Sequence, residues 1–198
     1  MLGGMARQGP VLTTPRLVLR PIVDDDLPRL TRILQEPGVA RWWGTYDEAR
    51  ARRELLTADE QTTVWAITQD GDLAGAVQVC EEPEPDYRHA GIDLFLAESF
   101  QGRGVGPEVV RRVAQHLVDD LGHHRMVIDP SVENVSAIAA YERVGFRRVG
   151  VMRRYERRDG QFRDGLLLEL VVPAAGREPE VALGDGELRL RRATVDDA

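Results

Sequence analysis

The sequence predicts an α/β fold, with a mixed sheet that carries helices on both faces. Residues 90–96 alternate apolar and polar side chains, as a strand with one buried face does. Residues 107–118 repeat apolar side chains at about the 3.6-residue period of a helix. Segments of these two kinds follow the order strand, two helices, three strands, helix, strand, helix and two strands, which is typical of one sheet covered by helices.

Six to seven strands and four helices are expected in turn. The strands lie at about residues 11–21, 63–68, 73–80, 90–96, 125–129, 146–156 and 165–172. The helices lie after the acidic N-cap Asp24-Asp25-Asp26, from Thr45 or Asp47 to about Thr57, at about residues 107–121, and from the turn at 131–134 to Gly145-Phe146.

Turn and capping residues mark where these elements end. Pro37-Gly38 ends the first helix, and Asp70-Gly71-Asp72 predicts a hairpin turn. Residues 81–87 are acidic and proline-rich, so we expect an irregular loop there. Gly122 is a C-cap candidate, and Arg158-Asp159-Gly160 joins the last two strands.

The chain is organised around the glycine-rich turn Gln101-Gly102-Arg103-Gly104-Val105-Gly106, which lies between a strand and a helix. Glycines let the backbone curl tightly and leave room for a ligand against the amides. The start of the helix adds free N–H groups and a partial positive charge, and Arg103 adds a formal one. This pattern predicts a cradle for a phosphate or pyrophosphate. A tight connection that holds no ligand is the alternative.

Length and composition indicate one soluble domain. The 198 residues are 42% hydrophobic and 30% charged, with a net charge of −7. A negative charge disfavours nucleic acid as a partner and is compatible with a cationic one. No apolar run approaches the roughly 20 residues that cross a bilayer, so no membrane association is expected. The single cysteine, Cys80, fits a reducing cytoplasm, where we expect a monomer or homodimer.

Other chemistries fit the sequence less well. The glycines do not have the dinucleotide spacing Gly-x-Gly-x-x-Gly, and there is no Gly-Lys-Ser/Thr for a nucleoside triphosphate loop. The four histidines lack a metal-ligand pattern, so no metal is expected. Cys80 has no evident histidine partner for cysteine catalysis.

Several segments, in order, resemble the GCN5-related N-acetyltransferases (GNAT) over roughly residues 15–172. They are the turn at 101–106, the run at 129–134, Ala137, Tyr141-Glu142-Arg143 and Gly145-Phe146. Further segments resemble the aminoglycoside 6'-N-acetyltransferases within that family, namely residues 40–44, 91–93, 129–131, 137–138 and 141–142. Residues 155–165 are a departure that is more similar to the ribosomal-protein N-terminal acetyltransferases, which leaves the acceptor open.

The resemblance implies a GNAT fold with a mostly antiparallel sheet, and an acetyl-coenzyme A-dependent transfer to a primary amine. An attacking amine must be neutral, and the leaving thiolate takes up a proton. The resemblance puts the base at Asp93 and the acid at Tyr141; a satisfied structural carboxylate and core packing are the alternatives. The coenzyme residues it implies are Leu94, Phe95, Leu96, Gln101, Gly102, Arg103, Gly104, Val105, Gly106, Asn134, Ala137 and Tyr141. Among them, an amide of residues 94–96 would bind the thioester oxygen, and Asn134 would hold the pantetheine arm or merely cap its helix.

A cationic amino sugar would need carboxylates and aromatic walls. The candidates are Trp42, Trp43, Gln78, Glu81, Asp86, Tyr87, Asp93 and Asp129. Each has a plain alternative. Adjacent tryptophans usually include a core anchor, residues 81–86 usually form a solvated loop, and Asp129 could cap the turn at 131–134. Trp42 and Trp43 are expected in the connection between two helices.

The first expectation is therefore an enzyme that acetylates the 6'-amine of an aminoglycoside. A protein N-terminal or small-polyamine acetyltransferase is the alternative enzyme, and an acyl-coenzyme A sensor or regulatory domain is the alternative without catalysis. Residues 1–10 are expected to be a flexible lead-in to a domain at 11–172. Residues 188–197 in the tail at 173–198 resemble residues 17–26, as a second copy of the first strand would, with chance as the alternative.

Overall fold

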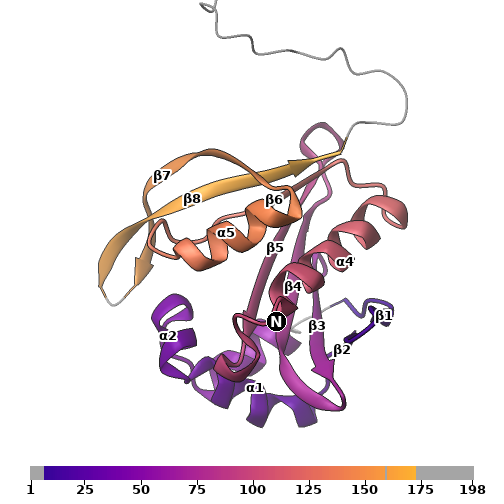
Figure 1. Ribbon diagram of the computed structural model, residues 1–198, viewed down its shortest axis with the longest axis vertical. Coiled ribbons are helices and arrows are strands. Elements are labelled where there is room, and N and C mark those ends of the chain that lie inside the picture. Colours follow the sequence, from indigo (N-terminus) through magenta and orange to yellow (C-terminus); the bar gives the residue numbers. More distant parts are fainter. Residues whose placement is uncertain (1–6, 159, 173–198) are drawn as a thin grey trace, which may run out of the picture.

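The computed structural model describes residues 7–158 and 160–172 and arranges them around one eight-stranded sheet (Figure 1). Its strand order is β1-β2-β3-β4-β5-β6-β8-β7. The strands are β1 (Leu12–Thr13), β2 (Val18–Pro21), β3 (Thr62–Gln69), β4 (Asp72–Glu82), β5 (His89–Leu96), β6 (Arg125–Ile128), β7 (Arg147–Arg158) and β8 (Gln161–Val171). Every neighbouring pair is antiparallel except β5 and β6. The expected mixed, mostly antiparallel sheet is confirmed.

Helices cover both faces of this sheet, as the sequence predicts (Figure 1). On one face lie α4 (Val105–Asp119) and α5 (Val135–Val144). On the other lie α1 (Leu27–Leu34), α2 (Pro37–Trp43) and α3 (Glu48–Ala51), which continues as a π-helical turn (Arg52–Leu56). Because side chains alternate along a strand, Leu94 and Leu96 pack on the α4 side and Phe95 packs on the α1 side. Asp93 therefore projects from the same face of β5 as Phe95.

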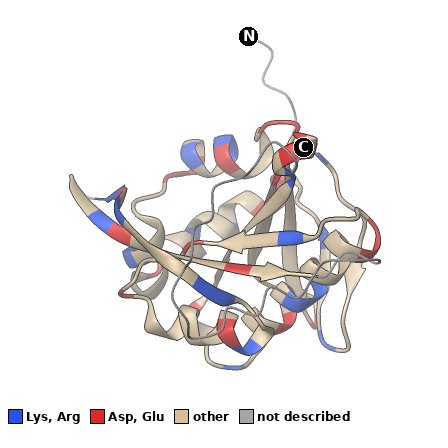
Figure 2. Cartoon of the chain, turned by 90° about the horizontal axis from the view of Figure 1, so that it is seen from above, with Lys and Arg blue, Asp and Glu red and all other residues tan. Residues whose placement is uncertain are grey.

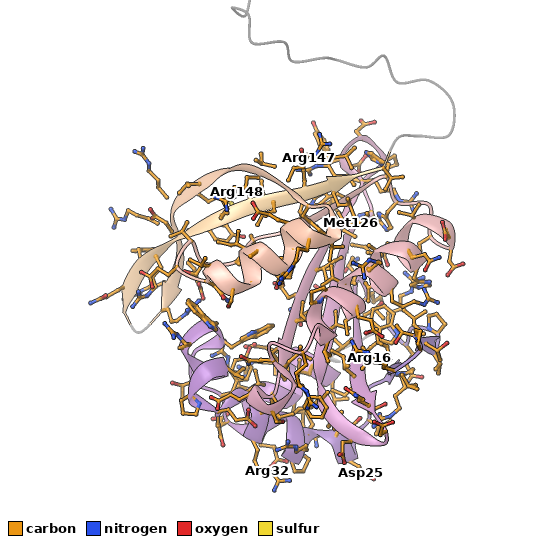
Figure 3. All side chains as sticks on the ribbon, viewed as in Figure 1. Arg16, Asp25, Arg32, Met126, Arg147 and Arg148 are labelled. Carbon is orange, nitrogen blue, oxygen red and sulfur yellow. The ribbon has the colours of Figure 1, made fainter. Side chains whose placement is uncertain are left out.

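The sheet changes from an apolar centre to a charged edge. Met126, in the inner strand β6, is completely buried. Arg147 and Arg148 are exposed on the edge strand β7 (Figure 3). Charged side chains on an edge strand disfavour pairing with other chains.

The pairing of β5 with β6 is short. Only two residue pairs face each other, Ala90 with Met126 and Gly91 with Val127, whereas β4 and β5 pair over eight residues. Beyond Gly91 the two parallel strands separate, so the second half of β5 has β4 on one side and no strand on the other. This divergence opens the middle of the sheet next to Asp93.

The N-terminal segment differs from the expected single strand at 11–21. A tight turn divides it into β1 and β2, where Thr14 accepts the Leu17 amide on its Oγ1 (2.9 Å) and donates its own amide to the Leu17 carbonyl (3.0 Å). The sheet consequently has eight strands, not six or seven. Residues 7–10 are also held: the Arg7 amide donates to the Thr62 carbonyl (3.0 Å), and the Trp65 indole donates to the Pro10 carbonyl (2.8 Å).

Two further expectations are wrong. Trp42 and Trp43 lie in α2 and not in a connection, because Pro37 occupies the first turn of a new helix, where proline is well tolerated. Glu81 and Glu82 are the last residues of β4, so the irregular connection begins after them. The tail at 173–198, with its similarity to residues 17–26, lies outside the described residues, as does Asp159 in the turn between β7 and β8.

Gly75, in β4, lies against the backbone of β5 with no room for a side chain. A Cβ added at Gly75 would lie 2.0 Å from the Phe95 carbonyl oxygen and 3.0 Å from the Leu96 Cα, both backbone atoms that cannot rotate away. Any larger residue would push apart the strand pair that bears Asp93. Gly150, in β7, offers the contrast, since a Cβ there meets nothing within 4 Å.

We predict that Gly75→Ala lowers the free energy of unfolding by about 2–3 kcal/mol, because the strands must separate to admit the methyl group. Gly150→Ala is the matched control and should change it by less than about 0.5 kcal/mol. Urea denaturation followed by circular dichroism measures both. Equal stability of the two variants would show that the close approach at Gly75 does not constrain the sheet.

Candidate active site

Two adjoining cavities open where β5 leaves β6. The glycine-loop cavity has a volume of about 520 Å³, and the carboxylate cavity, named for Asp93, Asp129 and Glu156 in its wall, has about 360 Å³. The residues that line both are Trp42, Trp43, Leu94, Asn134 and Tyr141. A molecule in one cavity can therefore meet a molecule in the other beside Leu94 and Tyr141.

The turn before α4 forms one end of the glycine-loop cavity. Gln101, Gly102, Gly104 and Gly106 line it. The amides of residues 102–106 donate no hydrogen bond to any described residue, so they remain available to a ligand. Gly102 and Gly104 have φ values of +68° and +78°, a conformation in which a side chain would be strained. The local sequence thus builds an open anion cradle at a helix start.

Not every residue of that turn contacts the cavity. The Arg103 side chain donates to the Ser99 carbonyl (3.1 Å) and lines neither cavity. Val105, the first residue of α4, has its side chain buried in the core. Two other arginines, Arg111 and Arg143, line the glycine-loop cavity instead. The cationic character expected of Arg103 therefore comes from residues that the sequence analysis did not select.

The β5 backbone contributes an amide between the two cavities. The Ala97 amide donates to the Ala74 carbonyl (2.8 Å), in register with the pair formed by Gly75 and Leu96. Since hydrogen-bonded pairs alternate in an antiparallel ladder, the amides of Leu94 and Leu96 point away from β4 and into the gap. The Leu96 carbonyl also points away from β4, because it accepts a hydrogen bond from Nε2 of Gln101 on the gap side (2.8 Å). The Leu94 N–H therefore faces the place where the cavities meet.

Asp93 is the central carboxylate of the second cavity. Its side chain is exposed to the open cavity, and the protein atoms packed around it desolvate the carboxyl group and raise its pKa to about 6. The negative charges of Asp129 and Glu156 raise this pKa further, while a long contact from the Gln78 amide nitrogen (3.5 Å) opposes the shift. A carboxylate with a pKa of about 6 is ionised at neutral pH and remains basic enough to accept a proton.

Tyr141 lies on α5 with its ring packed near Phe146, the ring centroids 6.3 Å apart. Its side chain is almost fully buried, and its hydroxyl forms no hydrogen bond with any described residue. Burial, followed by the charges of Asp93 and Asp129, raises the pKa of the phenol. Tyr141 thus keeps its proton and directs an unused donor at both cavities.

Asp129 and Asn134 have identifiable local partners. Asp129 follows β6, and its Oδ2 accepts the hydroxyl of Tyr155 (2.5 Å), so it does not act as the N-cap considered for the following turn. Asn134 does cap α5, because its Oδ1 accepts the Ala137 amide (3.2 Å). Asn134 nevertheless lines both cavities, and Ala137 lines the glycine-loop cavity.

Tyr155 is a cavity residue that the sequence analysis missed. The hydrogen bond to Asp129, followed by burial, raises the pKa of Tyr155 to about 12. A bulge between Met152 and Glu156 turns this part of β7 toward the cavity, with Arg154 at a positive φ of 53°. No local pattern predicts such a bulge. The other unpredicted residues in the wall are Tyr46, Arg50, Ile128, Pro130, Ser131, Glu156 and Arg158.

Aromatic and charged groups on the α1 side complete the wall. Trp43 packs edge-on against Phe95, with ring centroids 5.1 Å apart. The Tyr46 hydroxyl donates to Glu54 (2.5 Å), and the Arg50 guanidinium lies 4.0 Å from the centroid of the Tyr46 ring. Because Arg50 also pairs with Glu54 (2.8 Å), its charge is largely neutralised. Asp93 and Asp129 therefore dominate the charge of this cavity.

Three predicted acceptor residues lie elsewhere. Glu81 pairs with Arg7 (2.9 Å) and with buried His123 (2.7 Å), because it projects from the face of β4 opposite to Gln78. Asp86 and Tyr87 form a short 3-10 turn (Pro85–Tyr87) at the other end of β5 and line neither cavity. Asp93 comes six positions after Tyr87, which corresponds to about 20 Å of extended chain.

Neither a metal-ligand cluster nor a membrane-spanning helix is present among the described residues. They contain no group of three or more His, Cys, Asp or Glu residues placed to hold a metal ion. Among the described helices, none combines the length and the apolarity that crossing a bilayer requires. Arginines are conspicuous instead, including a series along the β7–β8 hairpin (Figure 2).

Comparisons with known proteins agree with this geometry. A family model described as an acetyltransferase (GNAT) domain matches residues 16–147. An aminoglycoside N(6')-acetyltransferase type 1 of Klebsiella pneumoniae is 31% identical over 156 residues, which cover 69% of this chain and 76% of that protein. The solved aminoglycoside acetyltransferase AAC(6')-Ib with coenzyme A has a TM-score of 0.67 and 27% identity, covering 78% of this chain and 94% of its own.

The ribosomal L7/L12 alpha-N-protein acetyltransferase RimL, solved with coenzyme A, has a TM-score of 0.71. It is 19% identical, and the match covers 82% of this chain and 98% of that one. At this identity the likeness shows the fold alone.

We predict that Asp93→Asn stabilises the protein at pH 8 and that the gain shrinks toward pH 4. The raised pKa means that the unfolded chain loses this proton at lower pH than the native protein does. Ionisation of Asp93 therefore favours unfolding as the pH rises through about 6, and asparagine removes this effect. Melting temperatures of both proteins from pH 4 to pH 8 measure it. A difference that is constant with pH, or that favours the wild type at pH 8, would contradict the raised pKa.

Proposed function

The chain belongs to the GNAT family of acetyl-coenzyme A-dependent N-acetyltransferases, and we propose that its acceptor is the 6'-amine of an aminoglycoside. The observation that carries the proposal is the carboxylate cavity, in which Asp93 and Asp129 face a space walled by Trp42, Trp43 and tyrosines. Carboxylates attract a polycation, and aromatic walls suit the faces of sugar rings. The relative from Klebsiella pneumoniae, named for this activity, supports the proposal.

The glycine-loop cavity fits the donor. Unpaired amides of residues 102–106 suit a pyrophosphate, and Arg111 and Arg143 suit its charge. An apolar wall that includes Leu94, Ala137 and Ala140 suits an extended, largely uncharged arm. Acetyl-coenzyme A supplies an acetyl group activated as a thioester.

Asp93 is assigned the role of base, directly or through a water. At neutral pH its carboxylate takes a proton from the acceptor's ammonium group, which frees the lone pair that attacks the acetyl carbon. The new C–N bond forms as the C–S bond breaks, and the nitrogen releases its second proton to solvent, which offsets the proton that the thiolate gains. Asp129, held by Tyr155, adds negative charge that keeps the cationic acceptor in place.

Leu94 and Tyr141 are assigned to the acetyl oxygen and to the leaving sulfur. The Leu94 N–H faces the gap and would donate to the acetyl oxygen as negative charge develops on it. The Tyr141 phenol, whose pKa is raised, donates its proton to the departing sulfur. The proton lost by the amine and the proton gained by the thiolate thus pass through separate residues.

A peptide acceptor is the second candidate. It is favoured by residues 155–165, which resemble the ribosomal-protein branch of the family. The volume of the carboxylate cavity is about 360 Å³, and Arg158 and Glu156 form a salt bridge in its wall. Both features favour a small acceptor over a polypeptide chain. A coenzyme-binding sensor without turnover is the third candidate.

We expect thiol release from acetyl-coenzyme A with aminoglycosides that carry a 6'-amine, and none with those that carry a 6'-hydroxyl. Release is measured against a panel of aminoglycosides, polyamines and short peptides, and the product is located by mass spectrometry and NMR. Turnover of peptides alone would replace the aminoglycoside with a protein N-terminus. Tight coenzyme binding with no turnover would support the sensor.

Asp93→Asn should lower kcat/KM for the amine about 10²–10⁴-fold, because the proton acceptor is lost. Wild-type kcat/KM should rise with pH up to about 6, where Asp93 ionises, and the variant should lack this limb. Tyr141→Phe is the comparison. It should lower kcat about tenfold or more. Its kcat/KM should still rise with pH up to about 6, because Asp93 is intact. Coenzyme affinity, measured by calorimetry, should hold in both variants, and full activity of Asp93→Asn would exclude it as the base.

A further inference from the structure

Arg158 is the only arginine that is buried among the described residues, with 8% of its surface exposed. It is the last residue of β7, at the turn into β8, where long charged side chains usually extend into water. Its guanidinium group instead lies in the wall of the carboxylate cavity. A buried arginine is costly unless its donors are satisfied, so its partners define its role.

Each nitrogen of this guanidinium has an acceptor. Nε donates to Oε1 of Glu156 (3.1 Å), and Nη2 donates to Oε2 of the same carboxylate. Nη1 donates to the Arg41 backbone carbonyl in α2 (2.5 Å). The first two bonds stay within β7, and the third crosses 117 residues of sequence to another element.

The crossing contact joins the two elements that wall the carboxylate cavity on its outer side. Figure 1 shows the β7–β8 hairpin extending past α5 toward α2. Arg41 precedes Trp42 and Trp43, which line both cavities, and Glu156 follows Tyr155, which holds Asp129. One side chain thus ties the tryptophan wall to the strand that carries the acidic wall.

We propose that Arg158 is a specificity-determining residue that latches the hairpin to α2 and thereby restricts the cavity to small amines. A polypeptide N-terminus needs an open path along which its chain can leave the cavity, and the latch closes the wall between α2 and β7. The inference rests on the proposed transfer to a small amine, because the latch selects among acceptors and not among donors.

Arginine is required for this role on geometric grounds. Its planar fork contacts both Glu156 oxygens and still presents a nitrogen to the Arg41 carbonyl. Lysine preserves the charge, but its single ammonium group cannot span the same three acceptors. Arg158→Lys therefore separates the latch from the charge. Arg157, the exposed neighbour on the same strand, does not line the cavity and provides the matched control.

The test compares Arg158→Lys, Arg158→Ala and Arg157→Ala with the wild type in the full chain. The ratio of kcat/KM for a 6'-amino aminoglycoside to kcat/KM for a short peptide should fall about tenfold or more in both Arg158 variants. The fall should come from a higher KM for the aminoglycoside and a gain with the peptide. Arg157→Ala should keep the wild-type ratio.

Tryptophan fluorescence gives a readout that does not depend on turnover. The chain has three tryptophans, and Trp65 is fully buried, so quenching by acrylamide reports on Trp42 and Trp43. Quenching should increase in both Arg158 variants as α2 separates from the hairpin. A wild type that acetylates no amine would refute the proposed function and leave the latch to be judged by quenching.

Two results would overturn the proposal. One is an acceptor ratio and a quenching constant that stay at wild-type values in folded Arg158→Ala. The other is an Arg158→Lys variant with the wild-type acceptor ratio and quenching constant, while both quantities change in Arg158→Ala. Charge alone would then account for the effect. Circular dichroism and the melting temperature identify variants that have lost the fold, and such variants are set aside in favour of the folded Arg158→Lys, in which faster hydrogen exchange at the α2 amides is expected.

Discussion

The separation of β5 from β6 is the constraint on which the rest of the site depends. Two parallel strands that pair only at Ala90 and Gly91 leave the second half of β5 without a neighbour on one side. A sheet that continued its pairing would have no gap, and the amide of Leu94 would be used in the ladder. Because the strands part, both cavities reach β5 and share residues on α2, β5 and α5.

The two cavities favour ligands of opposite charge, and both reach the same short strand, β5. On the α4 side, unpaired amides at a helix start favour an anion. On the α1 side, Asp93 and Asp129 favour a cation, and their mutual repulsion helps to raise the pKa of Asp93. Side chains alternate along β5, so Leu94 faces the α4 layer and Asp93 faces the α1 layer. The acidic group is therefore on the opposite side of the strand from the anion cradle. The raised pKa of Asp93 at the junction of the two cavities suits the proposed role of base.

Local patterns predicted the parts of the site that depend on short stretches of chain. The turn at 101–106, the cap at Asn134 and the place of Asp93 inside a strand follow from residues within a few positions of each other. The predictions that failed, and the residues that were missed, depend on contacts between segments far apart in the sequence. Whether Glu81 faces the site or the opposite layer depends on the register of β4, and its partner His123 is 42 positions away. The bulge that brings Tyr155 to Asp129 leaves no local signal in the sequence.

The segment at 155–165, which departs from the resemblance to the aminoglycoside 6'-N-acetyltransferases, supplies Tyr155, Glu156 and Arg158 to the wall of the carboxylate cavity. Tyr155 fixes one acidic group, and Arg158 joins the hairpin to α2. The anion cradle at residues 101–106, which the family's donor requires, is built from one continuous stretch, so its pattern is visible in the sequence. The carboxylate cavity, which we propose for the acceptor, is assembled from segments that include α2, β5 and β7, and a change in β7 can alter it without touching the glycine-loop cavity. This difference explains why the sequence identified the donor more firmly than the acceptor, and why the specificity that we propose rests on contacts between elements and less on any one motif.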